Sequence, residues 1–141
     1  MPAGQTRDYI FGYTILNDVS ARDVQTAHKQ WYFGKSLDGF TPIGPCIVTA
    51  DAFADYPPRL GIRSFVNGEK RQDSNTALQI FDIDHVIAEL SQGMTLKAGT
   101  IIATGTPAGV GMGMDPPQFL KPGDVVRCEI DGIGTLTNPV E

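Results

Sequence analysis

The stretch Gly12-Tyr13-Thr14-Ile15-Leu16-Asn17-Asp18-Val19-Ser20-Ala21-Arg22-Asp23-Val24-Gln25 combines the features of a strand, a turn and a helix start. Aromatic and β-branched residues dominate from Tyr9 to Leu16, which predicts a buried strand. Ser20 precedes Asp23 by three residues, as an N-cap precedes an acidic partner, and predicts a helix from Ala21 to near Gln30. The polar pair Asn17-Asp18 therefore lies where the strand turns into the helix.

An acidic side chain at such a junction can bind a metal or orient a substrate. The alternative is a turn residue that satisfies nearby backbone groups, and spacing alone favours it for Asp18. Both interpretations stay open on the residues of this stretch.

Composition indicates one globular domain over residues 1–141, with 41% hydrophobic and 19% charged residues. The net charge of −5 argues against nucleic acid or an anionic membrane as a partner. No apolar run has transmembrane length and the N-terminus lacks a signal-peptide core, so we expect a cytoplasmic protein without membrane contact.

The 16 glycines and 10 prolines indicate many tight turns and short strands. A second helix is expected from Asp82 to Ser91, ending near Gly93, and a brief helical turn from Asp51 to Tyr56. The expected strands, several joined by Asn-Gly or Asp-Gly turns, are 9–16, 43–49, 60–66, 69–73, 100–104, 125–130 and 133–140. Strands outnumber helices without regular βαβ alternation, which predicts a mainly antiparallel β fold with one or two short flanking helices.

Cysteine and histidine give no metal or redox motif. Cys46 and Cys128 lie in separate strand-like runs, so we expect two buried, unreactive thiols. His28 and His85 have no partner ligand at helical spacing, and we expect both to be incidental.

Four motifs together resemble the fumarylacetoacetate hydrolase family. They are Asn17–Gln25, Phe33–Asp38, Gly44-Pro45 and Thr104–Gly111, in the family's order and across nearly the whole chain. The resemblance implies a mixed β-sandwich roll with the active site at its mouth.

The resemblance also implies a set of site residues. Asp18 would supply a carboxylate to a divalent metal, usually Mg²⁺ or Mn²⁺ and sometimes Ca²⁺. Lys35 would contact substrate oxygens and stabilise a developing enolate. Gln25, Gly105 and Thr106 would bind the substrate, and Thr106 would contact the carboxylate of the substrate.

Each of these roles has a structural alternative. Lys35 could be a solvated loop lysine, and Gly105–Gly113 a mobile surface loop in which Met112 and Met114 have no role. A nucleotide site is not expected at Gly34-Lys35-Ser36, because a P-loop needs glycine where the chain has Lys29.

Three further groups are expected to be structural. Arg22 and Asp23 would form an ion pair or cap at the strand–helix corner. Asp82 and Asp84 would cap the second helix, where acidic residues are favoured. The aromatic run beginning at Trp31, with Tyr32 and Phe33, would either cover the pocket or pack in the core.

The resembled family carries a Glu-x-Glu pair and a catalytic His–acid pair upstream of the Asp18 motif. This chain begins seventeen residues before Asp18 and contains no Glu-x-Glu. We therefore expect an N-terminally truncated domain, or one that has lost its metal site.

Two hypotheses follow. The first is an enzyme that hydrolyses, decarboxylates or isomerises small 2-oxo, β-diketo or dicarboxylic acids through metal-assisted enolate chemistry. The sequence of its motifs is similar to the aromatic-catabolism branch of 2-hydroxyhepta-2,4-diene-1,7-dioate isomerases and related decarboxylases. We expect such an enzyme to be a homodimer or higher oligomer. The second is a non-catalytic fragment that folds by self-association, lacks a complete metal site and exposes an apolar face.

Overall fold

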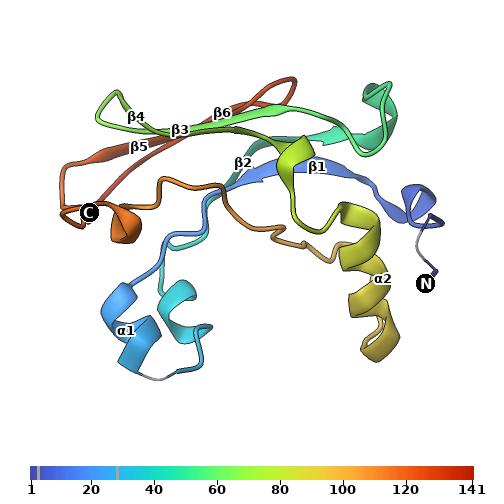
Figure 1. Cartoon of the computed structure of the whole chain (residues 1–141), viewed down its shortest axis with the longest axis horizontal. Coiled ribbons are helices and arrows are strands. Elements are labelled where there is room, and N and C mark those ends of the chain that lie inside the picture. The colour runs from blue at the N-terminus through green and yellow to red at the C-terminus, as the bar shows by residue number, and fades with distance from the viewer. Residues whose placement is uncertain (3, 28) are drawn as a thin grey trace.

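The computed structural model describes residues 1–2, 4–27 and 29–141, so His28 lies outside the described residues. The chain forms two antiparallel sheets in two layers, with both α-helices on the same side of the larger sheet (Figure 1). The small sheet pairs β1 (Gly12–Leu16) with β2 (Ile43–Thr49). The large sheet has the order β4-β3-β5-β6, comprising β3 (Gly61–Val66), β4 (Glu69–Asn75), β5 (Val125–Ile130) and β6 (Gly134–Pro139). The helices are α1 (Arg22–Ala27) and α2 (Ile83–Gly93), which confirms the mainly β fold with short flanking helices.

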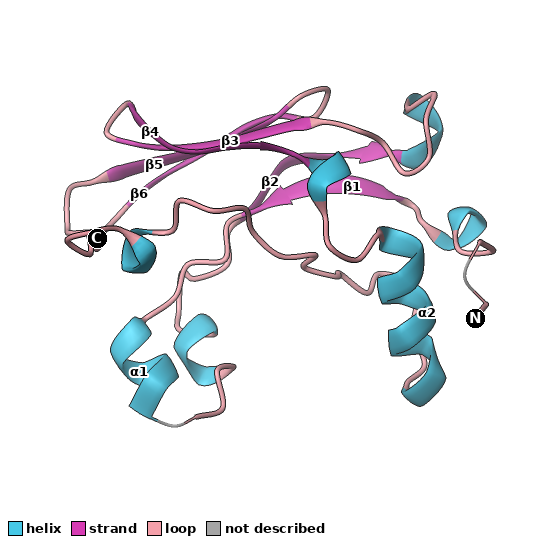
Figure 2. Ribbon diagram, in the orientation of Figure 1, coloured by secondary structure: helices cyan, strands magenta, loops and turns pink. Residues whose placement is uncertain are grey.

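The two sheets meet where β2 lies beside β6. Figure 2 shows both sheets on the same side of the two helices. Gly134 has φ +126°, and a Cβ there would lie 3.4 Å from the Pro45 ring. Ile15 on β1, Val126 on β5 and Ile133 in the turn just before β6 are buried. The small sheet thus covers part of the inner face of the large one, and its burial of Ile15 fixes β1 in place.

The β3–β4 hairpin turns at Asn67-Gly68, as its sequence predicts. Both residues have positive φ, +52° and +84°, which the tight hairpin turn requires. Asn67 Oδ1 accepts a hydrogen bond from Val125 N at 2.9 Å, and Asn67 Nδ2 donates to Asp124 Oδ1 at 2.8 Å. Asp124 Oδ2 accepts from Lys121 N at 2.8 Å, so one carboxylate joins the hairpin to the start of β5.

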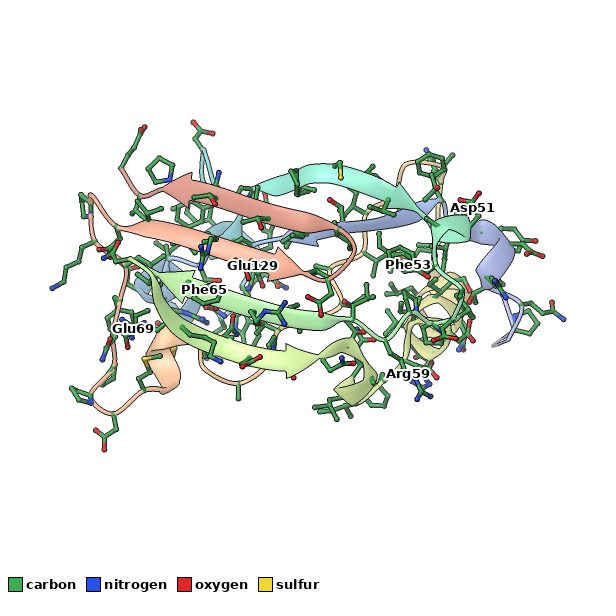
Figure 3. All side chains as sticks on the ribbon, turned by 90° about the horizontal axis from the view of Figure 1, so that it is seen from above. Asp51, Phe53, Arg59, Phe65, Glu69 and Glu129 are labelled. Atoms are coloured by element: carbon green, nitrogen blue, oxygen red, sulfur yellow. The ribbon has the colours of Figure 1, made fainter. Side chains whose placement is uncertain are left out.

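The face of the large sheet turned away from the helices is lined by ion pairs. Arg63 binds Asp131 and lies 3.6 Å from Glu129, and the hydrogen bond to Asp131 raises the pKa of the guanidinium above its usual range. The guanidinium of Arg127 lies 4.2 Å from the centre of the Phe65 ring. Figure 3 shows Phe65 and Glu129 on the adjacent strands β3 and β5. This face carries solvated charge pairs, which contribute little to stability.

Helix α2 begins at an aspartate cap and is anchored by its first turn. Asp82 accepts a hydrogen bond from His85 N at 2.8 Å, which agrees with the expected cap. Asp84 accepts hydrogen bonds from the Tyr56 hydroxyl, at 2.7 Å, and from Thr6, which is fully buried. Burial raises the pKa of Tyr56 to about 12, and the hydrogen bond to Asp84 adds to this increase.

Several expectations about secondary structure were wrong. The predicted strand 100–104 is irregular, and Ile101 is 58% exposed because no strand among the described residues pairs with this segment. Tyr9 belongs to the 3₁₀ turn Arg7–Tyr9 rather than to β1, and the expected turn at 51–56 is the shorter Ala50–Ala52.

The expectation that both thiols are buried was wrong for Cys46, which is exposed because most of the β2 side chains face outward. Cys128 is partly buried, and this burial raises the pKa of its thiol. The two thiols therefore differ in environment.

Large apolar side chains are exposed over much of the described surface. They are Tyr9, Phe11, Trp31, Tyr32, Phe33, Ile43, Ile47, Leu78, Ile80, Phe81, Met94, Ile101, Met112, Phe119, Leu120 and Val125. Among the described residues, no helix combines the length and apolar character that crossing a bilayer requires.

Substituting Asp124 tests the link between the hairpin and β5. The hydrogen bonds from Asn67 and from the Lys121 backbone lower the pKa of this carboxyl. Its ionised form therefore stabilises the fold above the unfolded pKa, about 3.9, and this stability is lost as pH falls through the lower folded value. In urea unfolding at pH 7, Asp124→Asn should be less stable than wild type, and the difference should shrink as pH falls below about 4.

The exposed Asp38 offers a matched control, because no hydrogen bond or ion pair among the described residues involves its carboxylate, so Asp38→Asn should be as stable as wild type at pH 7. If Asp124→Asn and wild type lose stability in parallel on acidification, the carboxylate does not hold the hairpin.

Candidate functional site

A lysine and an aspartate meet just beyond the end of β1. Lys35, the last residue of the 3₁₀ turn Phe33–Lys35, places its Nζ 2.5 Å from Asp18 Oδ2. The same ammonium group donates to Ser20 Oγ at 3.1 Å, and Ser20 Oγ donates to the Asp18 carbonyl at 3.2 Å. The Asp18 side chain is 42% exposed and that of Lys35 27%, so the pair is open to a ligand. Asp18, Ser20 and Lys35 are called the lysine cluster below.

Ser20 was expected to cap the first helix. Its hydroxyl instead accepts from Lys35 and donates to a backbone carbonyl, so it belongs to the lysine cluster. No sequence signal distinguished a helix cap from a hydrogen-bond partner of Lys35, because a serine just before a helix is suited to both roles.

The position of Lys35 depends on the glycine before it. Gly34 is buried against α1, and Ala21 N donates to Gly34 O at 2.8 Å. A Cβ on Gly34 would lie 2.8 Å from Gln25 N and 2.9 Å from Ala21 O, both backbone atoms. The absence of a side chain at Gly34 therefore allows the turn that carries Lys35 to pack on α1.

Gln25 lies on α1 with only 5% of its surface exposed. Its Oε1 accepts a hydrogen bond from Arg22 Nη1 at 3.1 Å. Arg22 thus has the structural role expected of it, although its described partner is Gln25 rather than Asp23.

Thr106 is exposed and hydrogen-bonded to β4. Gln72 Nε2 donates to Thr106 Oγ1 and to Pro107 O, each at 2.8 Å. Gly105 precedes it with φ +106°, a conformation that favours glycine, and a Cβ there would meet nothing within 4 Å. No hydrogen bond or ion pair between the described atoms joins Thr106 to the lysine cluster.

The aromatic run that follows α1 does not lie in the core. Trp31, Tyr32 and Phe33 are all exposed, so the expectation of core packing was wrong for them. Two surface hollows also lie elsewhere: one of about 530 Å³ beside Arg63, and one of about 560 Å³ beside Arg59. The candidate site therefore rests on side-chain chemistry rather than on a closed pocket.

The described residues do not by themselves form a metal site. No group of three histidine, cysteine, aspartate or glutamate residues converges among them. Asp18 is a suitable oxygen ligand, but it is paired with Lys35, and Mg²⁺ or Ca²⁺ needs several oxygen ligands. The ligand set is thus incomplete in the described part of the chain.

Comparison with known proteins identifies the family. A family model described as the fumarylacetoacetate (FAA) hydrolase C-terminal domain matches residues 1–141. The chain belongs to the fumarylacetoacetate hydrolase family. The resemblance in the four sequence motifs is thereby confirmed.

Individual relatives show how much of each protein is shared. Oxaloacetate tautomerase YisK of Bacillus subtilis is 52% identical over 133 residues, which are 94% of this chain and 44% of that protein. A fumarylacetoacetate hydrolase structure from psychrophilic Exiguobacterium antarcticum has TM-score 0.95 and 51% identity, over 100% of this chain and 50% of the other. The 2-hydroxyhepta-2,4-diene-1,7-dioate isomerase of Mycobacterium marinum has TM-score 0.86 and 47% identity, over 99% and 51%. The chain spans about half the length of these relatives.

Gly34→Ala should loosen the contact between the lysine turn and α1. Because the added methyl would press on backbone atoms rather than on a flexible side chain, we expect a loss of about 1–3 kcal/mol in unfolding free energy. Urea unfolding measures this loss. Gly93→Ala is the control, since a Cβ there meets nothing within 4 Å, and equal stability of the two variants would contradict the packing argument.

Metal titration tests whether the ligand set is incomplete. With one carboxylate in the lysine cluster, we expect Mg²⁺ and Mn²⁺ to bind this chain more weakly than about 1 mM in calorimetry, with the same heats for Asp18→Ala. Saturable binding that disappears in Asp18→Ala would show that further ligands do converge on Asp18.

Proposed function

We propose that this chain forms the substrate-oxyanion side of an enzyme that interconverts the keto and enol forms of small 2-oxo diacids. The lysine cluster carries this proposal, because it holds one ammonium group at the end of a strand and leaves it partly exposed. Residues 1–141 act in the proposal as one catalytic domain. The tautomerase and isomerase names of the relatives support the reaction class.

The chemistry requires stabilisation of a negative oxygen. Conversion of a 2-oxo acid to its enol moves a proton from the carbon next to the carbonyl to the carbonyl oxygen, through an enolate intermediate in which that oxygen carries the negative charge. A lysine ammonium group held beside that oxygen stabilises the enolate more than the neutral ketone, and so lowers the barrier. Lys35 has this role in our proposal, with Ser20 and Asp18 holding its Nζ.

Three further residues bind the substrate in this proposal. Thr106 and the backbone at Gly105 contact a carboxylate, which their exposure permits. Gln25 contributes a polar contact from α1. The substrates are oxaloacetate-like acids, and hydrolysis and decarboxylation remain alternatives of the same enolate chemistry within this family.

A divalent cation and self-association complete the proposal for the whole protein. We assign Asp18 as the carboxylate that this chain gives to Mg²⁺ or Mn²⁺. Since no group of three histidine, cysteine, aspartate or glutamate residues converges among the described residues, the cation needs further ligands besides Asp18. The exposed apolar side chains support a homodimer or higher oligomer. The comparisons do not favour a non-catalytic fragment, since the relatives include enzymes over 50% identical.

The test is a direct assay of ketonisation. The enol of oxaloacetate absorbs in the ultraviolet, and its decay is followed with and without protein and added Mg²⁺. Lys35→Ala should reduce kcat/KM by about 10²–10³-fold, the usual effect of removing one group that stabilises an oxyanion.

Lys97→Ala is the matched control, because Lys97 is an exposed loop lysine, and no hydrogen bond or ion pair among the described residues joins it to the lysine cluster. 2-Hydroxyhepta-2,4-diene-1,7-dioate serves as a second substrate and decides between the two named activities. Equal rates for wild type and Lys35→Ala on both substrates would refute the proposal.

A further inference from the structure

Gln72 lies on β4 directly opposite Ser64 of β3, and its amide is bound at both ends. Ser64 Oγ donates to Gln72 Oε1 at 2.8 Å. On the other side, Gln72 Nε2 donates to Thr106 Oγ1 and to Pro107 O. The side chain therefore links the central part of the large sheet to the loop that carries Thr106.

The partners of Gln72 fix which way each hydrogen bond runs. The Pro107 carbonyl oxygen can only accept, so the amide must turn its NH₂ group toward the loop. An amide NH₂ group donates and does not accept. Thr106 Oγ1 is therefore the acceptor of its bond with Gln72, and the hydroxyl proton of Thr106 must point to another group.

The surroundings of Thr106 leave that proton open to a ligand. Thr106 is exposed, and apart from the chain neighbours of Gly105 no described atom lies within 4 Å of the place where a Cβ on Gly105 would be. The far end of the same loop is also fixed, because a Cβ on Gly109 would overlap the Arg71 carbonyl of β4. The loop is thus held on β4 at Gln72 and beside Arg71, with one hydroxyl donor left free.

We propose that Gln72 is a positioning residue that makes Thr106 a hydrogen-bond donor toward a carboxylate of the substrate. This inference rests on the proposed function for the identity of the substrate. Its structural part does not, since the direction of the bonds follows from Ser64, Pro107 and Gln72 alone.

The kinetic test uses Gln72→Met, Thr106→Val and the double variant with oxaloacetate. A hydrogen bond to a carboxylate that persists through the reaction is uniform binding, so Gln72→Met should raise KM about tenfold and leave kcat nearly unchanged. The double variant should be no worse than Thr106→Val, because Gln72 acts through Thr106. The exposed Gln92 on α2 gives the control Gln92→Met, which should match wild type.

A binding test that needs no turnover uses malonate, a small dicarboxylate, followed by NMR of the Thr106 amide. Malonate should shift this signal in wild type and bind about tenfold more weakly to Gln72→Met. Gln72→Glu should weaken binding as well, because its carboxylate accepts from the Thr106 hydroxyl and withdraws that proton from the ligand.

Failure of the two ideas can be told apart. Wild type that binds malonate at Thr106 but turns over neither substrate would refute the proposed function and keep the role of Gln72. Additive kinetic losses in the double variant, or equal malonate affinity of wild type and Gln72→Met, would overturn the role of Gln72.

Discussion

Lys35 reaches Asp18 because Gly34, the residue before it, has no side chain where its backbone meets α1. The two charged residues come from segments on either side of the helix, and this close backbone contact brings the lysine turn near enough for Nζ to lie 2.5 Å from Asp18 Oδ2. The burial of Ile15 fixes the other end, since it anchors β1 and therefore the turn that carries Asp18. The candidate site thus depends on the absence of a side chain at Gly34 and on the burial of Ile15, rather than on a deep pocket.

Local signals predicted much of the fold because they act within a few residues. Asn67-Gly68 specifies a tight turn by its backbone conformation, and Asp82 specifies a helix start by its side-chain oxygen. The strand expected at residues 125–130 likewise has the bounds of β5. The family motifs added Lys35, which the structure places beside Asp18, and its chemical role stays a proposal.

The features that sequence reasoning missed all depend on distant partners. Residues 100–104 have the composition of a strand, but a strand also needs a neighbour, and the described chain provides none. Cys46 lies in an apolar run whose outer face stays uncovered. Ser20 and Gln72 look like a helix cap and an ordinary strand residue until Lys35 and Thr106 are placed beside them.

The contrast between the two thiols has a practical consequence for spectroscopy. Cys46 is exposed on β2, whereas burial raises the pKa of Cys128 and so lowers its thiolate fraction at neutral pH. A maleimide fluorophore should therefore label Cys46 selectively without any cysteine being removed. Since β2 lies beside β6, the attached dye would report on the junction between the two sheets.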